Sequence, residues 1–291
     1  MKHIADRREF LRHASAAGLG CLGGVLPAVA ARAAEPGGGL RAGAASVDVT
    51  PVKFPVLVSG GFLSRSNSKV NDRLFARCLV LDDGATRLAL MVVDTIVVPN
   101  PIQEAVLAGV SKSAGIPPEN MMISATHTHS GGALHGALGT KTDTDYAAFI
   151  PGKLIECIEK AAANLQPAKI GWGGEDHPEG TFCRVFIRRP DCIGADPLGR
   201  RNVRAMMSHG TSGDQQWQDY ANPAKPTSRI QYATGVAEAA LRAYERIEFH
   251  TSAPLAVAQR EIPVKLQQPD QEAQAWADKI YAELAGRDPQ T

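Results

Sequence analysis

Residues 87–126 decide the fold, because they begin with Arg87-Leu-Ala-Leu-Met-Val-Val93 and end with Met121-Met-Ile-Ser-Ala-Thr126. Both runs have the length of a strand, and the first is apolar on both faces, as is typical of a strand in a covered sheet. Between them, Pro101 is placed to begin a helix that Gly115-Ile-Pro-Pro118 ends. A strand, a helix and a strand with short connections form a βαβ unit whose two strands are parallel. The sequence therefore predicts an α/β fold.

Two histidines directly follow the second of these strands, in Thr126-His-Thr-His-Ser-Gly131. Side chains alternate along an extended chain, so we expect His127 and His129 to project from the same side. Neutral imidazole is a favoured zinc ligand, and a catalytic zinc takes about three protein ligands and one open position. The pair therefore predicts part of a zinc site. His135 is either a further ligand or a surface residue.

Asp94 occupies the place after the first strand that His127 occupies after the second. Ligand sites in sheets of this kind cluster at the carboxyl ends of the strands. Asp94 is accordingly a metal ligand, a carboxylate that orients one of the histidines, or a solvated loop residue.

A second polar segment, His209 to Asp214, reads His-Gly-Thr-Ser-Gly-Asp. The two glycines would let backbone N–H groups approach a substrate oxygen, with Ser212 as a nucleophile and Asp214 as a base or an orienting carboxylate. His209 would then be a candidate metal ligand. The same composition is also that of an ordinary turn.

A cluster of arginines precedes this loop. Its density suits an anionic or carboxylate-bearing substrate, although a solvated basic loop has the same composition. The cluster consists of Arg184, Arg188, Arg189, Arg200, Arg201 and Arg204.

Composition and the N-terminus bound the class of protein. With 31 basic and 30 acidic residues and 5% aromatics, the chain gives no electrostatic or stacking case for a nucleic-acid partner. Residues 1–34 combine a basic start with Arg7-Arg-Glu-Phe-Leu-Arg12 and a small-residue cleavage pattern at Ala31-Arg-Ala33. We expect a twin-arginine signal peptide that exports residues 35–291 to the periplasm or the medium, rather than a frayed basic terminus. A Cys183–Cys192 disulfide is then permitted, with buried free thiols as the alternative.

The rest of the chain alternates strands with helices and shows no internal repeat. Residues 175–219 are irregular and rich in Arg, Gly and Pro. Pro151-Gly152 should kink the helix expected over Tyr146–Leu165 or delay its start. The expected strands are Ala44–Val49, Leu74–Leu81, Lys169–Gly173 and one within Leu255–Leu266, and the expected helices are Tyr146–Leu165, Tyr232–Ile247 and Gln271–Leu284.

Taken together, these segments resemble the N-terminal catalytic domain of the neutral/alkaline non-lysosomal ceramidase family. The most specific match is Ser124-Ala-Thr-His-Thr-His-Ser-Gly131, and Gly210–Asp214 resembles a later loop of that family. The remaining matches are Ala44–Pro51, Asp72–Asp82 and Leu88–Asp94.

The resemblance implies a zinc-dependent amide hydrolase with a layered αββα sandwich of mixed sheets. It implies cleavage of the N-acyl bond of ceramide-like lipids by a zinc-activated water, and hence a lipid or other small amide as substrate and contact with a membrane surface. His127 carries over as a zinc ligand, His129 as a neighbouring residue that contacts substrate or water, and Arg188 as a substrate contact.

The chain also departs from the family. Relative to it, the chain is internally shortened and truncated at its C-terminus, so residues 35–291 form a partial catalytic domain that ends before the glutamate and tyrosine zinc ligands. The family has a second zinc histidine on a strand, and we expect no such strand in the short interval Asp191–His209. Gln216 stands where known ceramidases have a serine. Two alternatives therefore remain open: a hydrolase of a non-lipid amide or ester, and a non-catalytic family member with an incomplete metal site.

Overall fold

The computed structural model describes residues 39–286, apart from positions 62, 138, 179–181, 184, 196–200, 203, 207–214, 217–227 and 266–267. The predicted signal peptide lies outside the described residues, and so do His209, Ser212 and Asp214. Among the helices that are described, none is long and apolar enough to cross a membrane.

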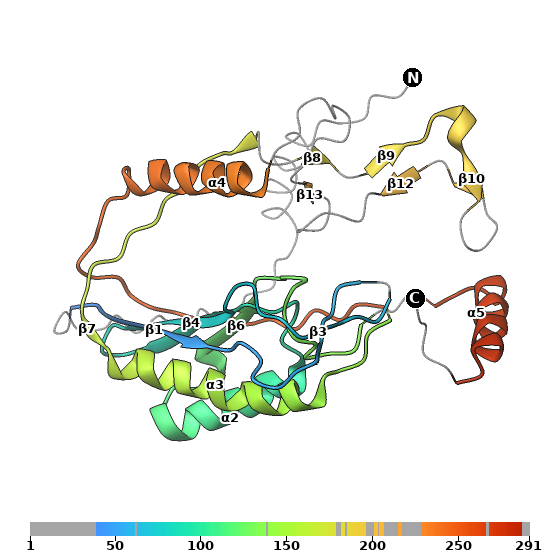
Figure 1. Ribbon diagram of the computed structural model, residues 1–291. Helices are drawn as coiled ribbons and strands as arrows, with labels where there is room; N and C mark the ends of the chain where they lie inside the picture. The colour runs from blue at the N-terminus through green and yellow to red at the C-terminus, as the bar shows by residue number, and fades with distance from the viewer. Residues whose placement is uncertain are drawn as a thin grey trace, which may run out of the picture. The chain divides into compact units, whose positions relative to one another are not determined.

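A five-stranded mixed sheet carries the histidine pair (Figure 1). β5 and β6 are parallel, with Val93 opposite Ala125, and the other neighbours are antiparallel. The predicted βαβ unit is confirmed, and with it the α/β class. The strand order is β6 (Met121–Ala125), β5 (Arg87–Val93), β4 (Phe75–Asp82), β1 (Arg41–Asp48) and β7 (Gln166–Pro167).

Helices α2 (Asn100–Ala114) and α3 (Thr144–Ala163) both lie on one face of this sheet (Figure 1). α2 starts with Pro101 in its first turn, and Gly115 ends it in the left-handed conformation, with φ 64°. The spacing of α3 places Ile150, Leu154 and Ile158 on its fully buried side. Burying each such side chain contributes about 1.5–3 kcal/mol.

Pro151 lies inside α3 and does not delay its start, so that part of the prediction is wrong. The helix begins at Thr144, and the Asp143 side chain caps it by accepting a hydrogen bond of 2.9 Å from the Tyr146 N–H. A proline inside a helix costs about 3 kcal/mol. The burial of Ile150, Leu154 and Ile158 along the same helix offsets that cost.

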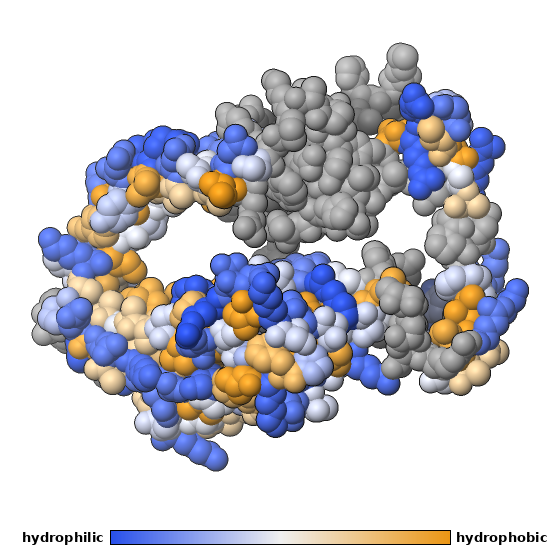
Figure 2. All heavy atoms as spheres, in the orientation of Figure 1, coloured by the Kyte–Doolittle hydropathy of each residue, from blue (hydrophilic) through white to orange (hydrophobic). Residues whose placement is uncertain are grey.

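The opposite face of the sheet is partly apolar and exposed. Leu79 of β4, Leu90 of β5 and Met122 of β6 are 39%, 39% and 57% exposed. Of the layers expected in an αββα sandwich, the described residues show the five-stranded sheet and its helical cover, and the other strands form two-stranded sheets. In the view of Figure 2, hydrophilic residues and smaller hydrophobic patches are interspersed on the visible surface of the part that carries α2 and α3.

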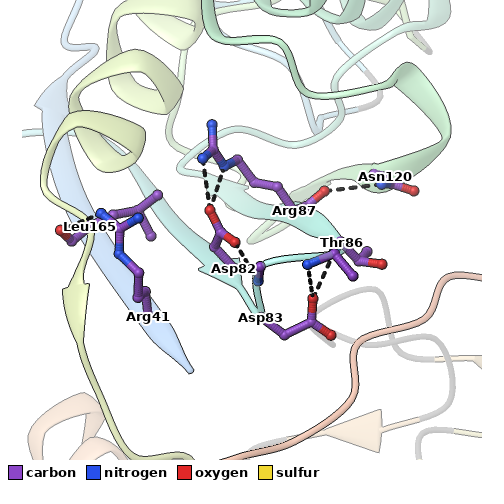
Figure 3. Close-up of polar contacts among 9 residues, drawn as sticks. Arg41, Asp82, Asp83, Thr86, Arg87, Asn120 and Leu165 are labelled. Atoms are coloured by element: carbon purple, nitrogen blue, oxygen red, sulfur yellow. Dashed lines mark hydrogen bonds and ion pairs between the residues drawn. The ribbon is translucent and has the colours of Figure 1, made fainter. Parts of the chain in front are cut away.

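The connection between β4 and β5 is a tight polar turn (Figure 3). Arg87 donates to one Asp82 carboxylate oxygen from Nε at 3.0 Å and from Nη2 at 2.7 Å. The second Asp82 oxygen accepts from the Gly84 N–H at 2.8 Å. Asp83 accepts from the Thr86 N–H at 2.7 Å and also from the distant Leu255 N–H at 2.8 Å. The turn is thus closed by its own side chains.

The remaining elements are short strands and two helices. α4 (Arg229–Tyr244) begins with a capping box at Ser228, and α5 (Gln271–Leu284) has the predicted bounds. The short elements are β2 (Val56–Leu57), β3 (Ser66–Asn67), η1 (Pro118–Asn120), β8 (Phe182–Cys183), β9 (Val185–Ile187), η3 (Pro190–Cys192), β10 (Gly194–Ala195), β11 (Arg201–Asn202), β12 (Arg204–Met206) and β13 (Gln215–Gln216).

Two expectations about strands are wrong. Residues 255–265 form no strand, and only Ile170, through a single bridge to His250, represents the strand expected at Lys169–Gly173. The interval Asp191–His209 contains short strands, because β10 pairs with β11, and β12 pairs back with β9, but none of these strands carries a histidine. In each case, pairing between distant residues decides the outcome, and local propensity does not.

Candidate functional site

The histidine loop, defined here as residues 126–132, begins where β6 stops. The Thr126 N–H still donates to Val93 O at 2.9 Å, which continues the parallel ladder by one bond. His127 then takes a left-handed backbone conformation with φ 58°. Histidine is one of the few non-glycine residues that adopt this conformation with any frequency. The loop therefore turns away from the sheet at His127.

The two histidine rings lie next to each other. Their centroids are 5.1 Å apart and their planes meet at 75°. The sequence predicted this proximity from the alternation of side chains along an extended strand. The cause is different, because the strand has ended and the turn at His127 brings the rings together.

Each ring is oriented by a backbone carbonyl. Nδ1 of His127 lies 2.8 Å from Ile96 O, and Nδ1 of His129 lies 2.9 Å from Gly60 O. A carbonyl oxygen only accepts, so Nδ1 carries the proton in both rings. In the neutral rings Nε2 then holds a free lone pair, which is the arrangement of metal-ligating histidines in proteins.

Gly60 is required by this geometry. Its φ is 108°, and a Cβ built on it would lie 2.5 Å from the His129 Nδ1. A larger residue would therefore be strained and would displace the ring. Gly60 follows β2, so His129 is held from a segment about seventy positions away in sequence.

The segment 56–67, called the β2–β3 hairpin here, is bound to the histidine loop at further points. The Arg65 guanidinium donates to the carbonyl oxygen of His129. Val58 forms a bridge with Gly132, and the buried Ser59 hydroxyl donates to His135 O at 3.2 Å. The hairpin and the loop thus form one structural unit.

The Tyr146 ring packs against the histidine loop at Gly132. A Cβ at Gly132 would lie 2.3 Å from the Tyr146 ring, so only glycine fits there. The Tyr146 hydroxyl donates to Val49 O at 2.8 Å, and its side chain is buried. Burial, with the charges of nearby carboxylates, raises the pKa of Tyr146. The phenol therefore stays protonated and acts as a structural donor.

A cavity of about 400 Å³ opens beside the loop. The hairpin and residues 69–74 form most of its wall, and the loop contributes Thr128, Ser130, Gly131 and Gly132. Val56 and Val58 line it with buried side chains, whereas Arg65 and Lys69 are exposed. The cavity is the place where a small molecule could lie next to the histidine pair.

Asp94 has partners other than the histidines. Its Oδ2 accepts from the Phe75 N–H and from Arg77 Nη1, both at 2.9 Å. The carboxylate therefore joins the ends of β4 and β5. Since both histidine Nδ1 atoms bind carbonyl oxygens, Asp94 orients neither of them through Nδ1.

The remaining predicted residues are less closely tied to the pair. Arg188 follows β9, and its Nη1 lies 3.5 Å from the position that a Cβ on Gly194 would take. Its role as a substrate contact stays a prediction. His135 is exposed. The roles of His209, Ser212 and Asp214 stay predictions as well, because these residues lie outside the described part of the chain.

A catalytic zinc takes about three protein ligands and one open position. Within the described residues, no group of three or more His, Cys, Asp and Glu side chains could hold a metal ion. His127 and His129 supply two imidazole donors of the right kind, so the described part of the chain fits zinc only in part. Asp94 and His135 do not complete the set.

The cysteines do not change this picture. Cys78 and Cys157 are buried free thiols, and burial raises their pKa to about 12 and about 11. Cys192 is exposed and free, so the Cys183–Cys192 disulfide is absent from the structure. The alternative of buried free thiols holds for the first two.

The sequence did not predict that the β2–β3 hairpin is part of the site. The Gly60-Gly61 dipeptide was a signal, but only for a turn. Nothing local marks Arg65, because its contact with His129 spans 64 positions.

Known proteins are similar to the part of the chain that contains the sheet and the histidine loop. Residues 41–185 match the family model described as neutral/alkaline non-lysosomal ceramidase, N-terminal. Through this segment, about half of its length, the chain belongs to that family. It includes the sheet, α2, α3, the hairpin and the histidine loop.

A neutral ceramidase from Pseudomonas aeruginosa is 29% identical over 170 residues, which cover 53% of this chain and 25% of that protein. The chain thus spans about a quarter of the length of this relative. Two solved structures are also similar. One is a ceramidase complexed with C2 (24% identity, TM-score 0.44), and the other is the P. aeruginosa neutral ceramidase (25% identity, TM-score 0.43). Each similarity covers 51% of this chain and 25% of the other.

Proposed function

We propose that the protein is a zinc-dependent amide hydrolase that cleaves the N-acyl bond of ceramide-like lipids. The observation that carries the proposal is the pair of adjacent imidazoles, each with Nδ1 bound to a carbonyl and Nε2 free. The family match and the relative named a neutral ceramidase support it. Hydrolase chemistry is what homology to ceramidases suggests for this chain.

In this proposal, His127 and His129 present Nε2 to the zinc ion, and His129 also contacts substrate or water. A bound zinc would polarise the amide carbonyl and activate water. Overall, the water oxygen bonds to the carbonyl carbon, the C–N bond breaks, and the amine nitrogen takes a proton. Arg188 would contact substrate, and His209, Ser212 and Asp214 would add a ligand, a hydroxyl and a carboxylate.

A second candidate is hydrolysis of an amide that is not a ceramide. The cavity beside the loop favours it, because Arg65 and Lys69 line its wall, and ceramides carry no charge for them to bind. The third reading, a family member without catalysis, makes the opposite prediction about metal.

The test measures zinc and hydrolysis in the same preparation of the full chain. We expect about one zinc per protein and cleavage of a short-chain fluorescent ceramide. His127→Ala should lose the cleavage and bind zinc far more weakly. Glu104→Gln, an exposed change on α2, is the matched control and should retain both. A well-folded protein that binds no zinc would contradict the proposal and support the non-catalytic reading.

We also propose that residues 1–34 export the protein through the twin-arginine route. The support is the sequence pattern around Arg7 and Arg8. A reporter fused to residues 1–34 should leave the cytoplasm, and the pair of substitutions Arg7→Lys and Arg8→Lys should retain it there. Export of the substituted fusion would contradict this route.

A further inference from the structure

The cavity beside the histidine loop has an apolar floor. Val56 and Val58 are buried at 5% and 7% exposure, and Leu74 is half-buried beside them. At about 400 Å³, the cavity is near the lower end of the range for small-molecule pockets, roughly 300–1,000 Å³. It suits one short apolar group rather than the two long chains of a lipid.

The rim of the same cavity has an excess of positive charge. Arg65 and Lys69 line it, with Asp72 as the acidic residue. The Arg65 guanidinium binds the His129 carbonyl, which leaves other N–H donors of its planar fork for a ligand. Lys69 is exposed and its ammonium forms no ion pair with any described residue. An anionic group is the natural partner for such a rim.

The cavity and the histidine pair share a wall. Thr128 and Ser130 line the cavity from positions directly beside His129, and Arg65 contacts His129 itself. A molecule in the cavity therefore lies next to the imidazoles. Its apolar part would face Val56 and Val58, and its anionic part would face Arg65 and Lys69.

We infer that the cavity binds the amine half of the substrate, and that this half is an amino acid with an apolar side chain and a free carboxylate. The substrate class is thus an N-acyl amino acid. This inference rests on the second candidate function, hydrolysis of an amide that is not a ceramide, and specifies its substrate. Water adds across the amide bond, which releases a fatty acid and the amino acid, whose nitrogen takes the proton.

The first test is binding, measured by calorimetry on the full chain without zinc. N-hexanoyl-leucine should bind about fivefold more tightly than the neutral N-hexanoyl-leucinamide, which is the upper end for a solvent-screened ion pair. Lys69→Met should remove this preference and Lys69→Arg should keep it. Lys112→Met, an exposed change on α2, is the matched control. Equal binding of the two compounds, or a preference that survives Lys69→Met, would overturn the inference.

The second test is hydrolysis by the zinc-loaded protein. The leucine compound should have a KM about fivefold lower than the leucinamide at similar kcat, and Lys69→Met should raise that KM alone. Faster cleavage of the leucinamide or of a short-chain ceramide overturns the inference but leaves the proposed amide hydrolysis intact. Cleavage of none of the three compounds overturns both.

Discussion

At the scale of single residues, the site depends on carbonyl oxygens that hold two imidazoles. Ile96 and Gly60 each accept from one Nδ1, at 2.8 and 2.9 Å. These two bonds fix the tautomers and leave Nε2 free in both rings. The left-handed turn at His127 then sets the rings 5.1 Å apart. No carboxylate is needed for the orientation.

Gly60→Ala tests this arrangement. The new Cβ would lie 2.5 Å from His129 Nδ1, so the ring must move away from the Gly60 carbonyl. We expect zinc affinity, measured by competition with a chelating dye, to fall about 10- to 100-fold, the effect of losing a partner that orients a ligand.

Gly84→Ala is the matched control for Gly60→Ala. Gly84 also has a positive φ, 89°, but nothing lies within 4 Å of its Cβ position. Both variants carry similar backbone strain, and only one disturbs His129. Equal zinc affinity in the two variants would show that His129 is not a ligand held by Gly60.

The sequence predicted these residues unevenly. The histidine pair was predicted because a two-residue repeat after an apolar run is a local pattern. The partners of the pair were not predicted, because Gly60 and Arg65 reach it over more than sixty positions. For Asp94 the sequence left three roles open, as a ligand, an orienting carboxylate or a loop residue, and its carboxylate in fact binds Arg77 on the neighbouring strand.

At the scale of elements, β5, α2 and β6 form the βαβ unit that the apolar runs indicate. Their bounds were predicted to within a residue, because each run is closed by Gly, Pro or a polar turn. Residues 255–265 have a similar alternation, but they pair with no strand among the described residues. Periodicity alone therefore did not decide whether a strand forms.

The β4–β5 turn should make stability depend on pH in the acid range. Burial alone would raise the pKa of the Asp82 carboxyl, but hydrogen bonds from Arg87 and Gly84 and the charges of Arg87 and Arg41 outweigh it and lower that pKa. The folded state then favours the ionised carboxyl. The stabilisation is complete above the unfolded pKa of about 3.9 and is lost as pH falls further.

Asp82→Asn should therefore lower the free energy of unfolding by about 1–3 kcal/mol at pH 7, because it leaves the half-buried Arg87 without its anion. The difference from the parent chain should shrink as pH drops below about 4. Urea unfolding at pH 7 and at pH 3 measures both effects. A difference that is the same at the two pH values would contradict this role of the Asp82 charge.

At the scale of the whole molecule, the described residues give the helical cover, the sheet and the histidine loop of a ceramidase-family domain. The exposed Leu79, Leu90 and Met122 on the free side of the sheet agree with the expected second sheet layer, which the sequence implied through resemblance. The family assignment covers residues 41–185, and the chain spans about a quarter of its curated relative. Activity of this chain is therefore a proposal that its own metal chemistry has to support.

X-ray absorption at the zinc edge of the purified full chain tests that proposal most directly. The account predicts nitrogen scatterers at about 2.0–2.1 Å with the outer-shell pattern of at least two imidazoles. It also predicts that His127→Ala and His129→Ala each remove one imidazole from that pattern. A zinc spectrum without imidazole, or one that neither substitution changes, would contradict the assignment of this histidine pair as a metal site.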